Sequence, residues 1–254
     1  MTPEELHNIF GAEKDFWWYQ GMRAITDALM DPLFKGRGGM GLDAGCGTGY
    51  NSLEWEKRHG LRMFGVDLAP LGIQYCRRRN FDRSLAASVM ELPFPDNCFD
   101  VVCSIDVLPV LPDGGDVRAL QEFARVLRPG GWLVLRVAAF RTLRSRHSEF
   151  VSERQRYRAR EMLPLLAALK FKVIRWTYAN AFLSPVAMLK FRVWETLRRE
   201  APHSGVATPP PPWMNRLLRR VLLCEAAMLR RGFRFPFGQS FLALAQKPAS
   251  SHNT

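Results

Sequence analysis

Short apolar runs alternate with amphipathic stretches along the chain from residue 40, and this alternation limits the possible folds more than any other feature. Helical periodicity occupies residues 50–58, 70–79 and 115–127. Strands that are apolar throughout and alternate with helices are typical of a parallel sheet covered on both faces. The sequence therefore predicts an α/β fold. Its first five strands are expected at residues 40–43, 61–66, 85–87, 99–104 and 132–137.

The sequence predicts four parts: the alternating core, one region before it and two regions after it. Residues 1–35 are expected to form an N-terminal aromatic helical lid, with one helix over 4–30 ended by Pro32 and the glycines that follow. Residues 36–179 form the core and include a further helix at 160–170 and a sixth strand at 171–178. Residues 180–238 are a basic helical insertion between strands six and seven, with helices near 185–200 and 213–231 around a proline run at 209–212. Residues 239–254 supply the seventh strand and a tail.

Positive charge is concentrated in the second half of the chain. The net charge is +12, and residues 136–235 hold 21 Lys and Arg against 6 Glu and no Asp. Such asymmetry indicates either an anionic partner or a solvated arginine-rich face. The expected helix at 213–231 has arginines beside apolar residues. It could lie on an anionic membrane surface or pack its apolar side on the core, and we favour packing on the core.

The termini and cysteines predict a reduced, cytoplasmic protein. No apolar run approaches the ~18 residues that a bilayer span requires, and the acidic start of the chain is unlike a secretory signal. The five cysteines are odd in number and have no metal-ligand spacing, so no metal site is expected.

The run GLDAGCGTG at residues 41–49 is the most informative motif for function. Its glycines at 45, 47 and 49 follow a strand and allow a sharp turn close to a ligand. Asp43 stands at the strand end, where a carboxylate suits a cationic ammonium group or an ordered water. Asp67 ends the next strand, where an acid can accept both hydroxyls of a ribose. Together these residues fit a nucleoside joined to an amino acid.

With these motifs, the sequence resembles the class I S-adenosylmethionine-dependent methyltransferases, in particular a small-molecule branch of the type 11 kind. GLDAGCGTG resembles their first motif and GVDL at 65–68 their second. ELPFPDNCFDVV at 91–102 and LRPGG at 127–131 are similar to the segments before their fourth and fifth strands. The resemblance implies a Rossmann-like sheet of seven mostly parallel strands, S-adenosylmethionine as cofactor, and methyl transfer.

The resemblance also implies the residues around the cofactor. Gly45, Cys46, Gly47 and Gly49 would line it through backbone groups, Asp67 would hold the ribose diol, and Leu68 would lie against the adenine. Ser88 stands where the family usually has aspartate, which weakens the expected contact with the adenine amino group. The cofactor residues implied are Tyr19, Arg23, Asp43, Gly45, Cys46, Gly47, Gly49, Asp67, Leu68, Ser88, Val89 and Ser104.

Methyl transfer needs alignment of the reactants, and a base only if the acceptor must lose a proton. The candidate catalytic residues are His147, Tyr157 and Asp106, with Tyr19 as a further candidate base. The arginines around Tyr157 are expected either to lower the pKa of its phenol or to bind an anionic substrate.

The favoured acceptor is an oxygen or carbon nucleophile, with nitrogen or sulfur left open, on a small acidic or lipid-linked metabolite. Residues 104–107 lack the Asp/Asn-Pro-Pro-aromatic pattern of enzymes that methylate exocyclic amines of nucleic acids. Two alternatives remain: a non-catalytic module that binds S-adenosylmethionine, and an RNA methyltransferase, whose binding would weaken steeply with salt. The sequence does not predict the oligomeric state.

Overall fold

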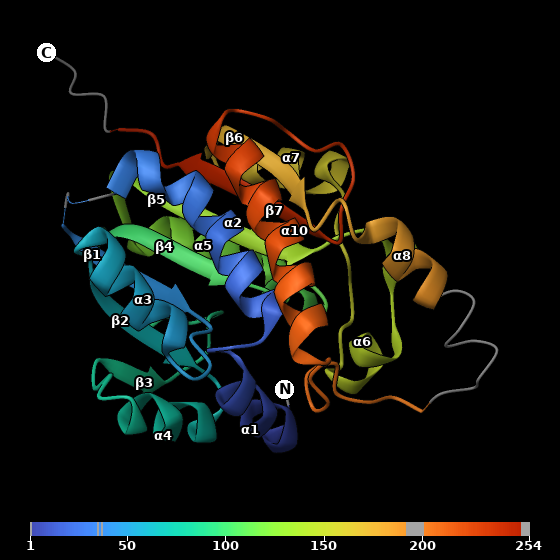
Figure 1. The fold of residues 1–254 in the computed structure, drawn as a ribbon. Helices are drawn as coiled ribbons and strands as arrows, with labels where there is room; N and C mark the ends of the chain where they lie inside the picture. Colours follow the sequence, from blue (N-terminus) through green and yellow to red (C-terminus); the bar gives the residue numbers. More distant parts are fainter. Residues whose placement is uncertain (1, 35, 37, 192–200, 250–254) are drawn as a thin grey trace, which may run out of the picture.

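A seven-stranded sheet forms the centre of the computed structural model, which describes residues 2–34, 36, 38–191 and 201–249 (Figure 1). The strand order is β3-β2-β1-β4-β5-β7-β6. Strand β7 runs antiparallel to both its neighbours, and the other pairs are parallel. The strands are β1 (Met40–Ala44), β2 (Arg62–Asp67), β3 (Ser84–Ala86), β4 (Phe99–Ile105), β5 (Leu127–Ala138), β6 (Lys172–Ala179) and β7 (Ser240–Gln246). The predicted fold, including the insertion between the last two strands, is confirmed.

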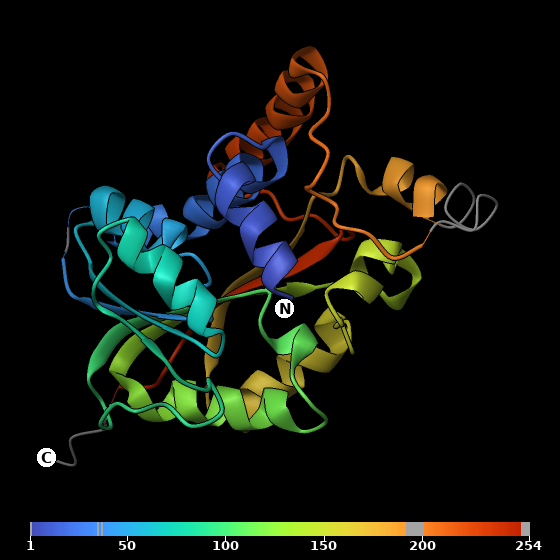
Figure 2. The same ribbon diagram turned by 90° about the horizontal axis from the view of Figure 1, so that it is seen from below.

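Helices cover both faces of the sheet, as Figure 2 shows from below. One face packs against α5 (Gly115–Val126) and α7 (Ala159–Ala168). The other packs against α2 (Trp17–Phe34), α3 (Tyr50–His59), α4 (Pro70–Arg78) and α10 (Pro212–Arg230). Apolar strand residues are buried on both sides, which explains why the core strands read as continuous apolar runs. The remaining helices are α1 (Pro3–Ala12), α6 (Arg146–Phe150), α8 (Ser184–Leu189) and the 3₁₀ turns η1 (Leu108–Val110) and η2 (Arg141–Leu143).

The prediction of one helix over residues 4–30 is wrong. The chain forms α1 and α2, and residues 13–16 between them turn so that Glu13 and Phe16 become buried. Helix α2 also continues through Pro32 to Phe34. The glycine-rich segment predicted as a turn before the fifth strand lies within the bounds of β5, as an irregularity between the pairs Phe99–Leu127 and Val101–Trp132. Part of the helix predicted near 185–200 lies outside the described residues.

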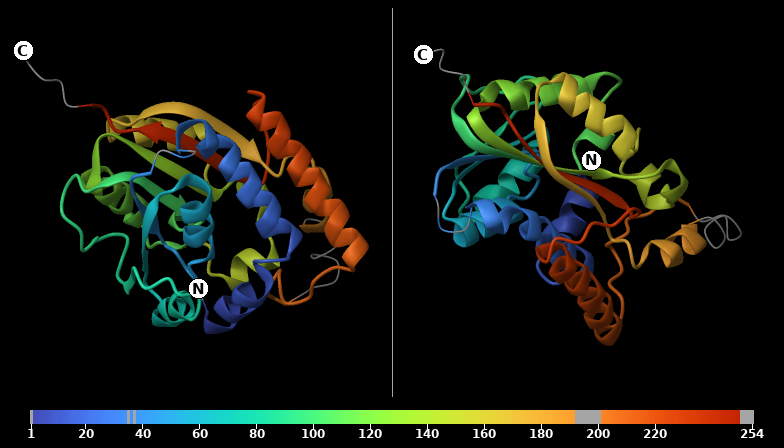
Figure 3. Two further views of the ribbon diagram at one scale, coloured as in Figure 1. Left: turned by 60° about the vertical axis from the view of Figure 1, so that its left-hand side comes forward. Right: turned by 90° about the horizontal axis from the view of Figure 1, so that it is seen from above.

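Helix α10 packs along α2, far from it in sequence (Figure 3). Gly21 permits this close approach, because a Cβ there would lie 2.3 Å from Leu222 Cδ1. Leu222, Ala226 and Leu229 are buried against the core, whereas Trp213 and Leu217 nearer the start of α10 are exposed. The buried apolar residues of the basic helix therefore lie in its second half.

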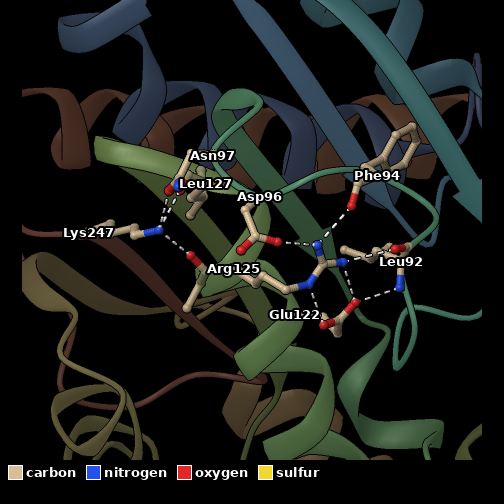
Figure 4. A network of polar contacts seen from close by, with 9 residues as sticks. Leu92, Phe94, Asp96, Asn97, Glu122, Arg125, Leu127 and Lys247 are labelled. Atoms are coloured by element: carbon tan, nitrogen blue, oxygen red, sulfur yellow. Dashed lines mark hydrogen bonds and ion pairs between the residues drawn. The ribbon is translucent and has the colours of Figure 1, made fainter.

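A polar network fixes the segment before β4 (Figure 4). The Arg125 guanidinium of α5 donates to the carbonyl oxygens of Leu92 and Phe94 and to the carboxylates of Asp96 and Glu122, at 2.7–2.9 Å. Glu122 also accepts a hydrogen bond from the Leu92 N–H at 2.7 Å. This network lies where β4 begins, at the sheet edge opposite the strand ends that carry the glycine loop, so its role is structural.

Replacing Arg125 with alanine is expected to lower the free energy of unfolding by about 3 kcal/mol, because several charge-assisted hydrogen bonds are lost together. Urea denaturation measures the change. Arg128→Ala is the matched control: Arg128 has one half-exposed ion pair, with Asp100 at 2.8 Å, and should cost less than about 1 kcal/mol. Equal losses in the two variants would contradict the structural role of the network.

None of the described helices combines the length and the hydropathy needed to cross a bilayer.

Candidate functional site

The glycine run makes a tight turn between β1 and α3. Gly45 has φ +93°, and a Cβ there would lie 2.1 Å from Val107 Cγ2, so the position requires glycine. The N–H groups of Gly45 and Cys46 both donate to the Val66 carbonyl oxygen, at 2.8 and 2.9 Å. Gly49, with φ +75°, is the N-cap of α3. The turn is thereby held against the end of β2.

Asp67 ties this turn to the loop after β2. Its Oδ2 accepts a hydrogen bond from the Gly47 N–H and its Oδ1 one from the Ala69 N–H, both at 2.9 Å. Each oxygen keeps a further lone pair. The carboxylate is therefore fixed by the backbone at the position where the sequence predicts a ribose-binding acid.

Asp43 is a buried carboxylate at the end of β1. Its side chain accepts a hydrogen bond from Ser52 Oγ at 2.6 Å, and the residue is 2% exposed. Burial raises the pKa of Asp43 to about 7, although the hydrogen bond from Ser52 opposes the shift. A cationic group beside Asp43 would lower this pKa and favour the ionised carboxylate.

The N-terminal segment closes over the glycine turn. Glu13 accepts hydrogen bonds from Thr48 Oγ1 at 2.5 Å and from Arg79 Nη2 at 2.6 Å, and its carbonyl oxygen accepts from Arg23. The aromatic residues at 16–19 line the space beneath, and burial is the main cause that raises the pKa of Tyr19. α1 and the start of α2 therefore form one wall of a cavity.

One continuous cavity of about 910 Å³ joins the glycine turn to the insertion. Asp43, Gly45 and Gly47 lie at one end. Seven apolar residues of the insertion line the other: Leu183, Val186, Ala187, Phe191, Val206, Met214 and Leu218. Pro209–Pro211 also line it, so the insertion contributes a wall of the cavity.

Two of the three candidate catalytic residues line this cavity, and both have partners. Asp106 pairs with Arg136 at 2.6 Å, and the Arg136 guanidinium lies 5.2 Å from the centre of the Trp18 ring. His147 Nδ1 accepts a hydrogen bond from the Gly205 N–H at 3.0 Å. In neutral His147 the proton therefore resides on Nε2, which makes that nitrogen a donor.

Tyr157 does not line the cavity. Its hydroxyl donates to Asp116 Oδ2 at 3.0 Å, and the residue is buried. Burial, with the negative charge of Asp116, raises the pKa of Tyr157. The alternative that neighbouring arginines lower this pKa is therefore wrong, because burial and the negative charge of Asp116 determine the shift.

The remaining predicted residues occupy different places around the site. Tyr19, Asp43, Gly45, Cys46 and Gly47 line the cavity. Leu68 is 75% exposed, and Ser88 Oγ accepts a hydrogen bond from the Met90 N–H at 3.1 Å. The predicted residues outside the cavity lining are Arg23, Gly49, Asp67, Leu68, Ser88, Val89 and Ser104. Their cofactor contacts stay predictions.

Three cavity residues escaped the sequence reasoning. Arg136 left a signal, since it is a charged residue within the apolar run of β5. Glu13 and Glu5 left none, because both are ordinary acids of an amphipathic segment. Glu5 is 1% exposed, and its Oε2 is buried without a hydrogen-bond partner among the described residues.

Comparisons with known proteins agree with this geometry. Residues 42–135 match the methyltransferase domain family. Among curated relatives, 27-O-demethylrifamycin SV methyltransferase of Amycolatopsis mediterranei is 31% identical over 53% of this chain and 52% of its own. Malonyl-[acyl-carrier protein] O-methyltransferase of Serratia marcescens is 38% identical over 39% of this chain and 38% of its own. The fatty-acid O-methyltransferase of Mycolicibacterium smegmatis is 34% identical over 55% and 50%.

The matches span about half or less of those relatives' lengths. Solved structures extend the likeness of fold to most of the chain. The [4+2]-cyclase SpnF superposes with a TM-score of 0.59 at 21% identity, covering 92% of this chain and 83% of its own. Geranyl diphosphate C-methyltransferase of Streptomyces coelicolor, solved with S-adenosyl-L-homocysteine, gives 0.57 at 18% identity, covering 87% and 79%.

The sheet order, the glycine turn and the cavity beside it define a Rossmann-like nucleoside-binding fold. Residues 42–135, which match the methyltransferase domain family, therefore form a class I S-adenosylmethionine-dependent methyltransferase domain. The residues present fit this cofactor. Gly47 lines the cavity with no atom within 4 Å of the position of an added Cβ, which leaves room for a ligand. Buried acids and aromatic rings nearby suit a sulfonium cation.

The affinity for S-adenosylmethionine is expected to rise roughly tenfold from pH 5.5 to 7, because Asp43 must lose its proton to attract the cationic ligand. Below its pKa of about 7, the carboxyl of the free protein is mostly neutral, and binding releases a proton. Calorimetric titration across this range measures the slope. Asp43→Asn should bind more weakly with a flat profile, and an unchanged slope in that variant would contradict the assignment.

Proposed function

We propose that this chain transfers the methyl group of S-adenosylmethionine to an oxygen of an acidic acceptor with an apolar body. The observation that carries the proposal is the single cavity, which joins the glycine turn to an apolar wall built by the insertion. The cofactor supplies an electrophilic methyl group on a sulfonium. Asp43, Gly45 and Gly47 are assigned to holding it, and the aromatic residues at 16–19 to excluding water.

The three candidate catalytic residues are not free to act as bases in the cavity, which supports an acceptor that is already ionised. Asp106 is neutralised by Arg136, the His147 lone pair at Nδ1 is occupied by the Gly205 N–H, and Tyr157 lies outside the cavity. A carboxylate needs no base at neutral pH, since its pKa lies well below 7. We assign His147 the role of donating Nε2–H to the acceptor.

Exposed apolar residues around the insertion support a lipid-like body for this acceptor. Val186 and Leu189 of α8 are 68% and 63% exposed, and Trp213 and Leu217 of α10 are 59% and 53% exposed. Val186 also lines the cavity. Exposed apolar residues beside an apolar cavity wall suit an alkyl or prenyl chain. Two of the relatives named above are a fatty-acid O-methyltransferase and a malonyl-[acyl-carrier protein] O-methyltransferase.

The proposal is tested with methyl-labelled S-adenosylmethionine and a series of alkyl carboxylic acids, with alkyl alcohols of equal length as controls. Mass spectrometry should detect methyl esters of the acids and no ethers of the alcohols. Cofactor binding without any methylated product would instead indicate a non-catalytic binding module. Labelling of RNA at low salt, in place of the acids, would identify an RNA methyltransferase.

A further inference from the structure

A second hollow, of about 380 Å³, adjoins the main cavity and is lined mainly by arginines. Arg141, Arg144, Arg154 and Arg156 surround it, with Glu153 and Gln155. Glu153 and Arg156 line both the hollow and the main cavity. The two spaces therefore share a wall.

We infer that this hollow, the arginine hollow, binds a phosphate or diphosphate group carried by the acceptor. The inference rests on the proposed function, since it names a second group on the same acceptor. The phosphate group is distinct from the carboxylate that receives the methyl group, and that carboxylate is assigned to the main cavity.

The charge of the hollow is mostly uncompensated. Its one carboxylate, Glu153, is occupied by Arg156, through Oε1 at 2.5 Å and Oε2 at 3.1 Å. Arg141, Arg144 and Arg154 have no ion pair among the described residues. Like charges gathered around one small space repel each other, and an anion placed between them removes that repulsion.

The backbone holds this arrangement in place. The Arg154 N–H donates to the Pro109 carbonyl oxygen at 2.8 Å, which fixes the loop after α6 to η1. The Arg144 guanidinium donates to the Glu153 carbonyl oxygen at 3.0 Å. Arg156 also donates to Ser148 Oγ and to the Ala139 carbonyl oxygen. Two guanidinium groups are thus anchored, while Arg141 and Arg154 are exposed and able to close on a ligand.

Guanidinium forks match the paired oxygens of a phosphate. Several arginines around one hollow carry more positive charge than a single carboxylate would balance. A phosphate or diphosphate supplies both the negative charge and the acceptor oxygens. Mainly polar walls also distinguish the hollow from the apolar end of the main cavity, so the acceptor is expected to have an anionic group beside its apolar body.

The test is calorimetric titration of the full chain with inorganic pyrophosphate at about 50 mM salt. The double variant Arg141→Ala/Arg154→Ala should weaken binding by roughly tenfold or more. Arg160→Ala is the matched control, since Arg160 is an exposed arginine of α7 that does not line the hollow. Lysine at both positions should restore only part of the affinity, because it keeps the charge but loses the fork.

Failure of pyrophosphate to bind, or equal weakening in the Arg160→Ala variant, would overturn the inference.

Decyl phosphate and inorganic phosphate distinguish the source of the anion. Tighter binding of decyl phosphate, lost in the double variant, assigns a lipid-linked acceptor, and equal binding of both assigns a soluble phosphorylated one. S-adenosylmethionine affinity is measured on the same samples. If it is normal while pyrophosphate fails to bind, only this inference is lost, and if the cofactor itself does not bind, the proposed function is lost instead.

Discussion

Replacing Asp67 with alanine is expected to weaken S-adenosylmethionine binding at least about 100-fold, because two charge-assisted hydrogen bonds that shape the site disappear with the carboxylate. Gly47 N–H and Ala69 N–H both donate to it at 2.9 Å. Without it, the glycine turn and the loop after β2 lose their common anchor. Calorimetric titration measures the affinity, and circular dichroism checks that the variant is folded.

A ligand series separates this anchoring role from a direct contact with the ribose. Removing the 2′-hydroxyl from S-adenosylhomocysteine should weaken binding to the original chain roughly tenfold and should cost the Asp67→Ala variant almost nothing. Asp67→Asn, which keeps an acceptor oxygen, should lie between the two. An equal loss for the deoxy ligand in both chains would show that Asp67 acts only through the backbone.

Replacing Glu13 with alanine is expected to lower the free energy of unfolding by about 3 kcal/mol and to release the N-terminal segment from the glycine turn. The change leaves the guanidinium of Arg79 without its carboxylate, in a largely buried position. Thr48 also loses its partner. Urea denaturation measures the stability, and hydrogen exchange over residues 3–20 reports the release.

Thr48→Val is the matched control for this prediction. It removes one hydrogen bond and leaves the Glu13–Arg79 pair intact, so it should cost only about 1 kcal/mol. If both variants lose the same stability and exchange stays slow over residues 3–20, the N-terminal segment is held by its apolar contacts, and Glu13 is not its anchor.

The sequence predicted the central sheet well because its information there is local. A continuous apolar run or a helical period occupies adjacent residues, and all seven strands lie within a few residues of their expected positions. The glycine turn and Asp67 were equally accessible, since positive φ angles and a strand-end acid leave a mark in the residue types themselves.

Tertiary structure alone decided how distant segments close the cavity. The side chain of Asn215 in α10 accepts a hydrogen bond from the Trp17 N–H and donates to the Asp15 carbonyl oxygen, both at 2.9 Å. About 200 residues separate these partners, and no periodicity records such a pairing. The break between α1 and α2 arises in the same way, because the buried contacts of Glu13 outweigh local helical preference.

The sequence by itself therefore determined the sheet, the cofactor turn and the abundance of positive charge. It did not determine where that charge gathers. Arg141, Arg144, Arg154 and Arg156 surround one hollow because the loop after α6 folds back to η1. The orientation of side chains on such a loop depends on contacts with other elements, which a linear pattern does not contain.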